Sequence, residues 1–122
     1  MSPEKEKVLF ESFPLLYSEL TYLECGDGWF DLIYDLSEKL EVLIRKYIVE
    51  NLKDEILPYA DQIKEKFGYL RFNMNYYIYD TMDLIEEYVR KTQKVCEICG
   101  AKGSISGECW QQCLCDNCRK KD

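Results

Sequence analysis

The sequence predicts an α+β protein, mainly α-helical, in which two long helices and a short β-hairpin precede a C-terminal four-cysteine zinc knuckle or ribbon. Three observations support this fold class. Apolar residues recur every three or four positions over residues 29–51 and again over 76–93. Apolar and polar residues alternate over residues 69–74, and two Cys-x-x-Cys pairs lie in the last quarter of the chain. Helical spacing, strand-like alternation and paired metal ligands are distinct sequence signals.

We expect the chain to divide into two parts. Residues 1–93 are predicted to form a helical body with the hairpin near residues 61–75, and residues 94–122 a zinc-binding C-terminal module. A chain of 122 residues buries only a modest core, and short chains commonly add a metal for stability. The apolar fraction of 47% indicates a folded globule rather than a disordered chain.

The N-terminal segment carries mixed signals. Pro14 interrupts it, and the leucines that follow are spaced as in one short amphipathic helix near residues 15–23. Residues 25–29 have the sequence Cys-Gly-Asp-Gly-Trp and are predicted to form a turn, because glycines adopt backbone angles closed to other residues. Asp27 or Gly28 is expected to cap the helix that follows.

Two long helices are predicted from their apolar spacing. Residues 29–51 carry the strongest helical pattern, with charged residues on much of the opposite face. Asp31 lies in the first turn of this helix, where the helix dipole favours a negative charge. Residues 76–93 return to helical spacing and end just before Cys96. We therefore expect the metal module to rest on the end of this second helix.

A β-hairpin is predicted between these helices. Residues 69–74 place apolar side chains at alternate positions, as a strand does. Residues 60–67 fit either a helix that ends at Gly68 or a first strand that turns there. We favour the hairpin, because an isolated strand needs a pairing partner.

The two Cys-x-x-Cys pairs have fifteen residues between them. A tight turn brings two thiolates onto one metal, and two such turns supply the four corners of a tetrahedron. We predict one structural zinc ion held by Cys96, Cys99, Cys115 and Cys118. Gly100 follows the first pair, where a side chain would crowd the sulfur atoms. Iron is the alternative metal for four thiolates.

Two further cysteines, Cys109 and Cys113, complicate the choice of ligands. Cys113 and Cys115 are separated by one residue, so only one of them joins Cys118 in a turn of the right length. Cys115 has the required two-residue gap and is the predicted ligand. We expect Cys109 and Cys113 to be small buried or half-buried residues.

Charge and composition limit the classes of partner. The formal net charge is −7, and there is no histidine. A protein that binds nucleic acid mainly through its phosphates carries a clear basic stripe, which this sequence lacks. It also has no apolar run of membrane-spanning length and no hydrophobic signal core near Met1. Paired cysteines fit zinc binding in a reducing compartment, so we expect a cytoplasmic protein without a membrane partner.

The hairpin is the predicted binding site. Cations and aromatic residues are interleaved there within nine residues of an otherwise acidic body. Such side chains anchor protein interfaces, and they also stack on and neutralise a nucleotide. The alternative is a solvated hairpin whose aromatic residues lie in the core. The candidate binding residues are Lys64, Lys66, Phe67, Tyr69 and Arg71.

The segment 25–29, the block Lys-Glu-Lys-Phe-Gly-Tyr-Leu-Arg-Phe at residues 64–72 and the two tail Cys-x-x-Cys pairs together resemble a family of small uncharacterised phage and prophage proteins. Its members usually carry Lys-Glu-Lys-Phe-Gly-Gly-Leu-Arg-Phe-Tyr and end in Cys-x-x-Cys, Gly-Trp, Cys-x-x-Cys. The four predicted ligands match the family's tail cysteines, and Trp110 matches its tryptophan. This chain departs from the pattern at Tyr69, Asn73 and Cys109. The resemblance implies a phage-encoded protein in the host cytoplasm, and it supplies no activity.

Three classes of function fit the sequence to different degrees. An enzyme is disfavoured, because no histidine is present to act as a base and four thiolates leave no open metal position. Cys25 is the candidate nucleophile, with the carboxylates of Asp27, Asp31 and Asp35 nearby. A nucleic-acid-binding zinc-ribbon protein and a protein that sequesters a small signalling nucleotide are the alternatives. We expect a non-catalytic protein that binds a host protein, as an inhibitor of host defence or of nucleic-acid machinery.

Overall fold

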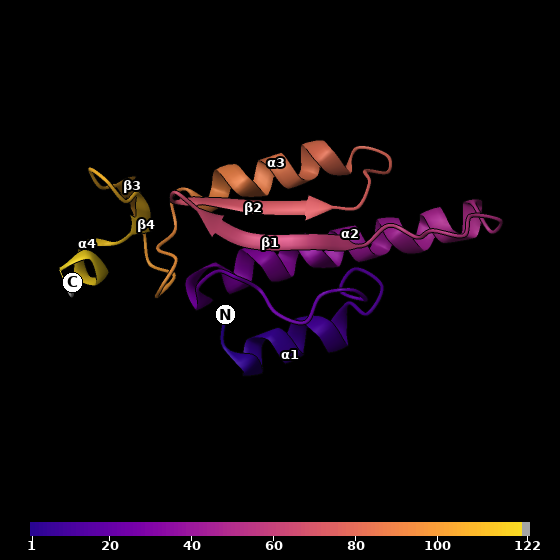
Figure 1. Ribbon diagram of the computed structural model, residues 1–122, viewed down its shortest axis with the longest axis horizontal. Helices are drawn as coiled ribbons and strands as arrows, with labels where there is room; N and C mark the ends of the chain where they lie inside the picture. The colour runs from indigo at the N-terminus through magenta and orange to yellow at the C-terminus, as the bar shows by residue number, and fades with distance from the viewer. Residues whose placement is uncertain (121–122) are drawn as a thin grey trace.

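Helix α2 (Phe30–Glu50) is the longest element, and the other elements of the body pack along it (Figure 1). The computed structural model describes residues 1–120. Helix α1 lies on one side of α2, and the first hairpin with helix α3 lies on the other. The remaining elements, in chain order, are α1 (Pro3–Ser12), the short 3-10 helix η1 (Asp27–Trp29), β1 (Ala60–Lys66), β2 (Tyr69–Met74), α3 (Thr81–Thr92), β3 (Ser104–Ser106), β4 (Gln112–Leu114) and α4 (Asp116–Arg119).

The predicted α+β fold with a hairpin and a four-cysteine C-terminal cluster is confirmed. The match to two long helices is loose, because α2 has 21 residues and α3 only 12. Residues 76–80, expected to begin the second helix, form bends and turns instead. The Asn75 side chain explains this: its Oδ1 accepts hydrogen bonds from the backbone N–H of Tyr59 at 2.8 Å and of Tyr76 at 3.0 Å. Within the described chain no helix is long and apolar enough to cross a membrane.

Helix α2 buries one stripe of its surface, as its spacing predicts. Ile33, Leu36 and Leu40 are fully buried at successive turns, and each such side chain contributes about 1.5–3 kcal/mol when it leaves water. Asp31 does lie in the first turn. The predicted capping is wrong, because the N-cap position is Trp29 and no side chain caps the helix.

The helix predicted near residues 15–23 does not form. The segment makes turns, because other parts of the fold use its backbone. The N–H groups of Leu15 and Leu16 donate to the buried carboxylate of Glu41 at 3.2 and 2.8 Å. The carbonyl of Leu16 accepts from the N–H of Ala60 at 2.8 Å. The first helix is α1, whose N-cap Ser2 accepts a hydrogen bond from the N–H of Lys5.

The first hairpin is antiparallel, and both of its strands are present, so the hairpin interpretation of residues 60–67 is confirmed. Its two-residue loop has Phe67 at φ 54° and Gly68 at φ 87°, the backbone of a type I′ turn. Lys66 faces Tyr69 across the strands, and Ile63 faces Phe72. Ile63, Leu70, Phe72 and Met74 are buried against the helices.

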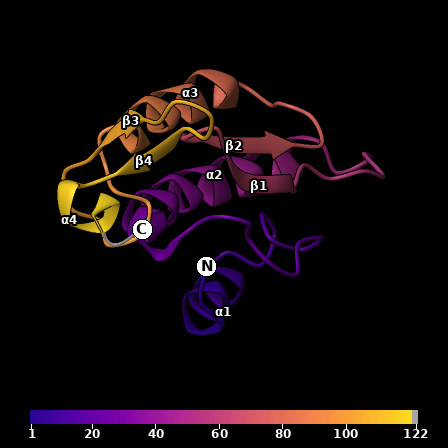
Figure 2. The same cartoon turned by 60° about the vertical axis from the view of Figure 1, so that its left-hand side comes forward.

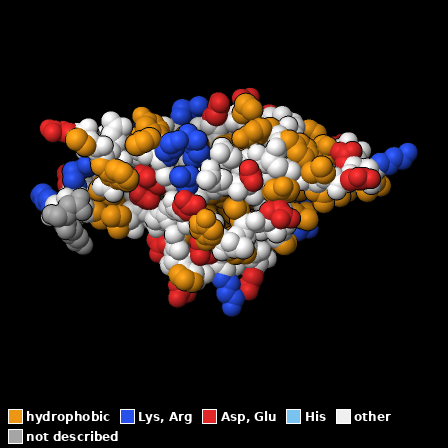
Figure 3. Space-filling model, viewed as in Figure 1, with side chains coloured by type: hydrophobic (Ala, Val, Ile, Leu, Met, Phe, Trp, Pro, Cys, Tyr) orange, Lys and Arg blue, Asp and Glu red, His pale blue; other side chains and the backbone are white. Residues whose placement is uncertain are grey.

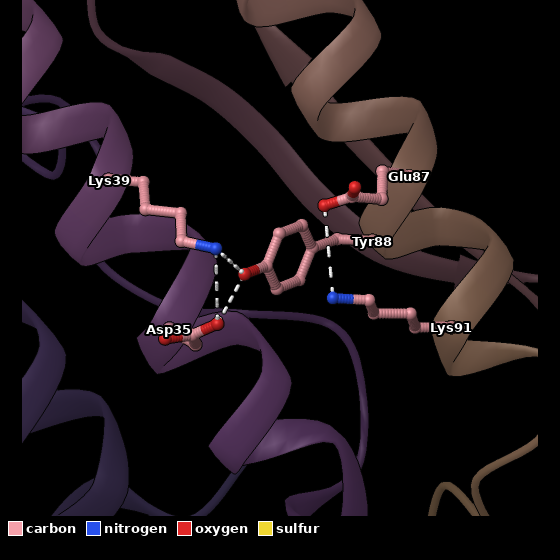
Figure 4. Close-up of polar contacts among 5 residues, drawn as sticks. All are labelled: Asp35, Lys39, Glu87, Tyr88 and Lys91. Atoms are coloured by element: carbon pink, nitrogen blue, oxygen red, sulfur yellow. Dashed lines mark hydrogen bonds and ion pairs between the residues drawn. The ribbon is translucent and has the colours of Figure 1, made fainter.

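Helix α3 is fastened to α2 by a group of polar side chains (Figure 4). The Tyr88 hydroxyl donates to the Asp35 carboxylate and accepts from Lys39 Nζ at 2.6 Å. The Nζ atoms of Lys39 and Lys91 lie 5.0 and 4.3 Å from the centroid of the Tyr88 ring. Glu87 forms an ion pair with Lys91 at 3.8 Å. The tyrosine therefore joins the two helices through both its ring and its hydroxyl.

The second hairpin, β3–β4, and helix α4 lie together at one end of the molecule (Figures 1 and 2). Three hydrogen bonds join the start of this region to the segment before α2. The N–H of Gly28 donates to the carbonyl of Glu97 at 2.7 Å, and the N–H of Gly26 donates to its Oε2 at 2.9 Å. The indole Nε1 of Trp29 donates to the carbonyl of Val95 at 2.8 Å.

The glycines of residues 25–29 are required by this contact, and the sequence-based reason for them is wrong. Neither Gly26 nor Gly28 has a positive φ. A Cβ atom on Gly28 would lie 2.0 Å from the carbonyl oxygen of Cys96, and one on Gly26 would lie 2.3 Å from that of Glu97. The two glycines let the backbone of the cysteine turn approach the backbone of the body directly.

Candidate functional site

The four predicted ligand cysteines come together in one cluster. Their sulfur atoms all lie within 4.8 Å of one another, and Cys99 Sγ is 3.6 Å from Cys115 Sγ. Four ligands at a Zn–S distance of ~2.3 Å place neighbouring sulfur atoms about 3.8 Å apart. The cluster therefore has the dimensions of a tetrahedral metal site. Three of the thiols are buried and Cys99 is exposed, which leaves the metal position close to the surface.

Each Cys-x-x-Cys turn is built by its own backbone. The N–H of Gly100 donates to the carbonyl of Cys96 at 2.9 Å, and Gly100 has φ 83°. This left-handed backbone favours a glycine, but the reason expected from the sequence is wrong. A Cβ atom on Gly100 would meet the backbone of Gly28, with its carbonyl oxygen 3.3 Å away, and not the sulfur atoms. In the second turn the N–H of Cys118 donates to Cys115 Sγ at 3.4 Å, at the start of α4.

The sulfur atoms lie in an environment that favours a thiolate at one position. Burial opposes ionisation of Cys96, but backbone hydrogen bonds at Cys99, Cys115 and Ile98 lower the pKa of its thiol to about 6. A thiolate is the form that binds a metal. These four residues together can hold a soft or borderline divalent ion in a closed set of sulfur ligands.

The two remaining tail cysteines have different roles. Cys113 is buried, as expected, and its Sγ lies 3.2–3.4 Å from three backbone carbonyls at the end of α3, those of Thr92, Gln93 and Val95. It therefore binds the end of α3, a role that its spacing alone does not reveal. The prediction for Cys109 is wrong, because this residue is exposed near the tip of the second hairpin.

Arg119 is a structural residue that the sequence analysis missed. Its Nη2 donates to the carbonyls of Ser104 at 2.8 Å and Leu114 at 3.2 Å, and its Nη1 donates to that of Ser106 at 3.5 Å. The guanidinium group thereby fastens helix α4 to both strands of the second hairpin. Its position immediately after Cys118 is the only sequence signal of this role.

Four of the five predicted binding residues share one face of the first hairpin, and the fifth, Phe67, lies in its turn. The β1–β2 register pairs Lys64 with Arg71 and Lys66 with Tyr69, and directly paired residues point to the same side of a sheet. Lys64 has a carboxylate partner, Glu24, at 3.9 Å. Within residues 1–120, neither Lys66 nor Arg71 has a carboxylate within 4.0 Å. Two cations are therefore placed on this face without a neutralising partner in the described chain.

A groove of about 580 Å³ lies between β2 and α3. Four of the five predicted binding residues line it, and Lys64 does not. Helix α3 and the turn before it contribute the exposed side chains of Met82 and Tyr77, together with Val89 and Glu86. Lysine and arginine side chains gather over the hairpin end of β2, with hydrophobic side chains beside them (Figure 3). The lining residues supplied by the hairpin prediction are Lys66, Phe67, Tyr69 and Arg71.

The candidate nucleophile Cys25 is buried, and two of the three carboxylates named with it are held in hydrogen bonds. Burial raises the pKa of the Cys25 thiol to about 12. Asp27 Oδ1 accepts a hydrogen bond from the N–H of Ser2 at 2.7 Å, and Asp35 is engaged by Tyr88. At neutral pH the Cys25 sulfur stays protonated in an apolar setting, which is the inert form of a cysteine.

Comparisons of the chain with protein-family models, curated proteins and solved structures found no match. The resemblance to small phage proteins therefore stays a prediction. The geometry alone defines two features: a four-cysteine cluster with the dimensions of a metal site, and a groove with cationic and apolar lining beside the first hairpin.

Proposed function

We propose that this is a small zinc-stabilised cytoplasmic protein that acts without catalysis, by binding a partner protein through the exposed face and turn of the β1–β2 hairpin. The resemblance to phage proteins makes that partner a host protein, with inhibition of host defence or nucleic-acid machinery as the biological outcome. The zinc ion is held by the four clustered cysteines and has a structural role.

One observation carries the proposal: the hairpin face is unfavourable for the isolated protein. Lys64 and Arg71 face each other directly across the strands, and like charges in this position are destabilising. Glu24 neutralises only Lys64. A partner that supplies a carboxylate to Arg71 removes this repulsion.

The turn of the hairpin adds a second unfavourable feature. Phe67 is 56% exposed and has φ 54°, a left-handed conformation that is uncommon for a bulky side chain. Backbone strain of this kind concentrates at functional sites. An exposed aromatic side chain that lines the same groove as an arginine matches the composition of interface hot spots. The features that destabilise the free protein locally are therefore the same features that a partner would recognise.

The zinc assignment rests on the donor set. Four thiolates in two tight turns, with no histidine in the chain, fit the closed tetrahedral site of structural zinc. Such a site contributes folding free energy directly. A closed site gives no position for a substrate or a reactive water, which agrees with a non-catalytic function.

The test is affinity capture from a host lysate with the full chain as bait, followed by measurement of the affinity for each captured protein. Arg71→Ala should weaken the specific interaction by about 2 kcal/mol or more, the level of a hot spot. Its melting temperature should equal or slightly exceed that of the wild type, because Arg71 has no ion-pair partner among residues 1–120 and its removal relieves the repulsion with Lys64.

Two matched variants separate this proposal from its competitors. Lys53→Ala removes an exposed cation in the turn beyond α2 and should leave binding unchanged. Trp110→Ala removes an aromatic side chain that is 67% exposed on the second hairpin. Binding that is lost with Trp110→Ala and retained with Arg71→Ala would move the partner site to the metal module and contradict the proposal.

A further inference from the structure

The outer edge of β2 presents unpaired backbone groups to the groove. The carbonyl of Ile63 accepts from Glu24, and the N–H of Glu65 donates to Glu24, both at 2.9 Å. These groups of β1 therefore point away from β2. Their register partners are Phe72 and Leu70, and in an antiparallel pair both members of such a position point outward. The N–H and C=O groups of Leu70 and Phe72 thus face away from β1.

No strand covers that edge in the described chain. The first sheet consists of β1 and β2 only, and the isolated bridge at Glu24 lies beside β1. Leu70 and Phe72 are themselves among the residues that line the groove. An unpaired strand edge is a template for another extended chain. In this protein the edge lies at the floor of the groove, where Leu70 and Phe72 are each 3% exposed, and helix α3 forms the facing wall.

We propose that the groove binds an extended segment of a partner protein, which adds to β2 as a further strand and alternates acidic with apolar side chains. This inference rests on the proposed function and specifies its chemistry. Strand addition gives affinity through main-chain hydrogen bonds and specificity through alternate side chains. The unpaired backbone groups of residues 70 and 72 supply the main-chain hydrogen bonds. The two walls of the groove supply the side-chain specificity.

The alternation follows from the two faces of β2. On the outer face, a residue of the added strand that lies opposite Arg71 meets an unneutralised guanidinium, with the amine of Lys66 further along the hairpin, so an acidic side chain is favoured. The next residue points to the inner side and meets Met82 and Val89 of α3, so an apolar side chain is favoured. Glu86 on the helix wall disfavours an acidic residue in that second position.

The net charge of the whole protein restricts the binding of an acidic partner segment to this edge. The net charge of −7 repels an acidic segment from most of the surface. Lys66 and Arg71 provide a local exception beside the unpaired strand edge. A basic segment would meet these two cations, so charge complementarity selects the acidic one.

The first experiment titrates the full chain with three pools of fluorescent seven-residue peptides. One pool alternates Asp or Glu with Val, Leu or Phe, a second replaces the acids by Lys or Arg, and a third has the acidic residues in one block. The alternating acidic pool should bind at least about tenfold more tightly than either control, a difference of about 1.4 kcal/mol. Equal binding of the alternating and blocked acidic pools overturns the proposal.

The second experiment tests for the backbone hydrogen bonds themselves, using the best peptide with N-methyl groups at alternate amides. In a strand, successive N–H groups point to opposite edges. Methylation in one phase should therefore weaken binding by about tenfold or more, and methylation in the other phase should leave it within about twofold. A peptide held only by its side chains loses the same affinity in both phases, and that result overturns strand addition.

Variants of the protein complete the test. Arg71→Glu should abolish the preference for acidic peptides, whereas Lys53→Glu, which makes the same change in net charge outside the groove, should preserve it. Met82→Gln should weaken binding, whereas Val49→Gln on exposed α2 surface should not. A peptide-independent dimer that is lost with Met82→Gln identifies a second copy as the occupant and overturns the peptide proposal.

The outcomes also separate this inference from the proposed function. If a captured host protein depends on Arg71 but both N-methylated phases of the best peptide bind equally, the hairpin is still the interaction surface and strand addition is wrong. In the opposite case, no captured protein depends on Arg71, while N-methylation of the alternating peptides weakens binding in one phase only. The strand edge is then functional, and the proposed route to a host protein is wrong.

Discussion

The β1–β2 and β3–β4 hairpins are both antiparallel, but different forces hold them. The first turns Ile63, Leu70 and Phe72 into the main core, where each is almost fully buried. The second has strands of three residues. Its Leu114 joins Cys96, Cys115 and Cys118 in a separate small cluster, whereas its Cys113 reaches the main core. Apolar burial is therefore the main support of the first hairpin, whereas the second rests on the four-cysteine cluster, the Arg119 hydrogen bonds, close backbone contact and the burial of Cys113 alone in the main core.

This difference indicates how one short chain separates its stability from the recognition surface proposed above. The first hairpin is anchored by its inner face, so its outer face and edge are free to carry exposed cations and aromatic residues. The second hairpin uses its few side chains to hold itself together. Removing the interactions that hold each hairpin should therefore affect different properties of the protein. The following experiments are ordered from the largest expected effect to the smallest.

The largest effect should follow removal of a metal ligand. Cys96→Ser should abolish metal binding and disorder residues 94–120, because structural zinc contributes folding free energy directly. Most of the helical circular dichroism should survive, since α2 and α3 have their own apolar core. Elemental analysis of the variant and a chelator titration of the wild type both test this expectation. Complete loss of helicity would show instead that the body and the metal module fold as one unit.

Two other cysteines serve as controls for this result. Cys109→Ser changes an exposed thiol outside the cluster and should leave the metal content intact. Cys113→Ser should also leave it intact, although the contact with the end of α3 is weakened. Metal that is lost with Cys113→Ser and kept with Cys115→Ser would contradict the ligand assignment.

A core substitution in the first hairpin should come next. Phe72→Ala is expected to lower the free energy of unfolding by about 3–5 kcal/mol, because it removes a buried aromatic ring and leaves a cavity. Metal stoichiometry should not change. Phe67→Ala is the matched control, since the same truncation at an exposed turn position should cost less than about 0.5 kcal/mol. Similar losses for the two variants in a denaturant titration would show that the inner face does not anchor the hairpin.

An added methyl group at the junction should have an intermediate effect. Gly28→Ala places a Cβ atom 2.0 Å from the Cys96 carbonyl oxygen, and relief of such a clash typically costs about 1–3 kcal/mol. Both the melting temperature and the affinity for zinc should fall, because the cysteine turn is displaced. Asp31→Ala, an exposed change at the start of α2, is the control. Unchanged metal affinity in Gly28→Ala would mean that the junction does not support the site.

The smallest effect is expected between α2 and α3. Tyr88→Phe removes the hydroxyl bound to Asp35 and Lys39 and should cost about 1 kcal/mol, a typical hydrogen-bond contribution. The hydrogen bond from Tyr88, opposed by partial desolvation and aided by Lys39, lowers the pKa of Asp35. Its stabilisation is therefore present above the unfolded-state pKa and is lost as the pH falls.

Unfolding titrations at several pH values test this sign. The difference between wild type and Tyr88→Phe should shrink as the pH is lowered below about 4, the ordinary range of an aspartate. Tyr77→Phe removes a hydroxyl on the groove side and should show no such dependence. A difference that grows in acid would contradict the assigned role of Asp35.

Local signals predicted much of the fold and of the metal cluster. The spacing of apolar residues predicts α2, because one stripe of that helix is buried. The two-residue gap distinguishes Cys115 from Cys113, because a cysteine turn has a fixed length. Long-range contacts explain what was missed. The backbone near Leu16 is used by Glu41 and Ala60, which lie far along the chain, and no local pattern reveals such partners.

The candidate binding site was predicted in composition but not in shape. The sequence identifies the cations and aromatic residues of the hairpin, yet it cannot show that Glu24 neutralises Lys64 and leaves Arg71 free. It also gives no sign that α3 forms the second wall of a groove. These facts depend on register and packing, which join segments that are separate in the sequence.

The contact between Trp29 and Val95 also has a consequence for biosynthesis. The indole is fully buried, and its N–H donates to a carbonyl 66 positions further along the chain. A ribosome adds about 5–20 residues per second, so this side chain waits several seconds for its acceptor. During that interval the nascent N-terminal part exposes an aromatic ring. The order of synthesis thus makes closure of the tail a late folding event, and the fluorescence of Trp29 during translation would report when it occurs.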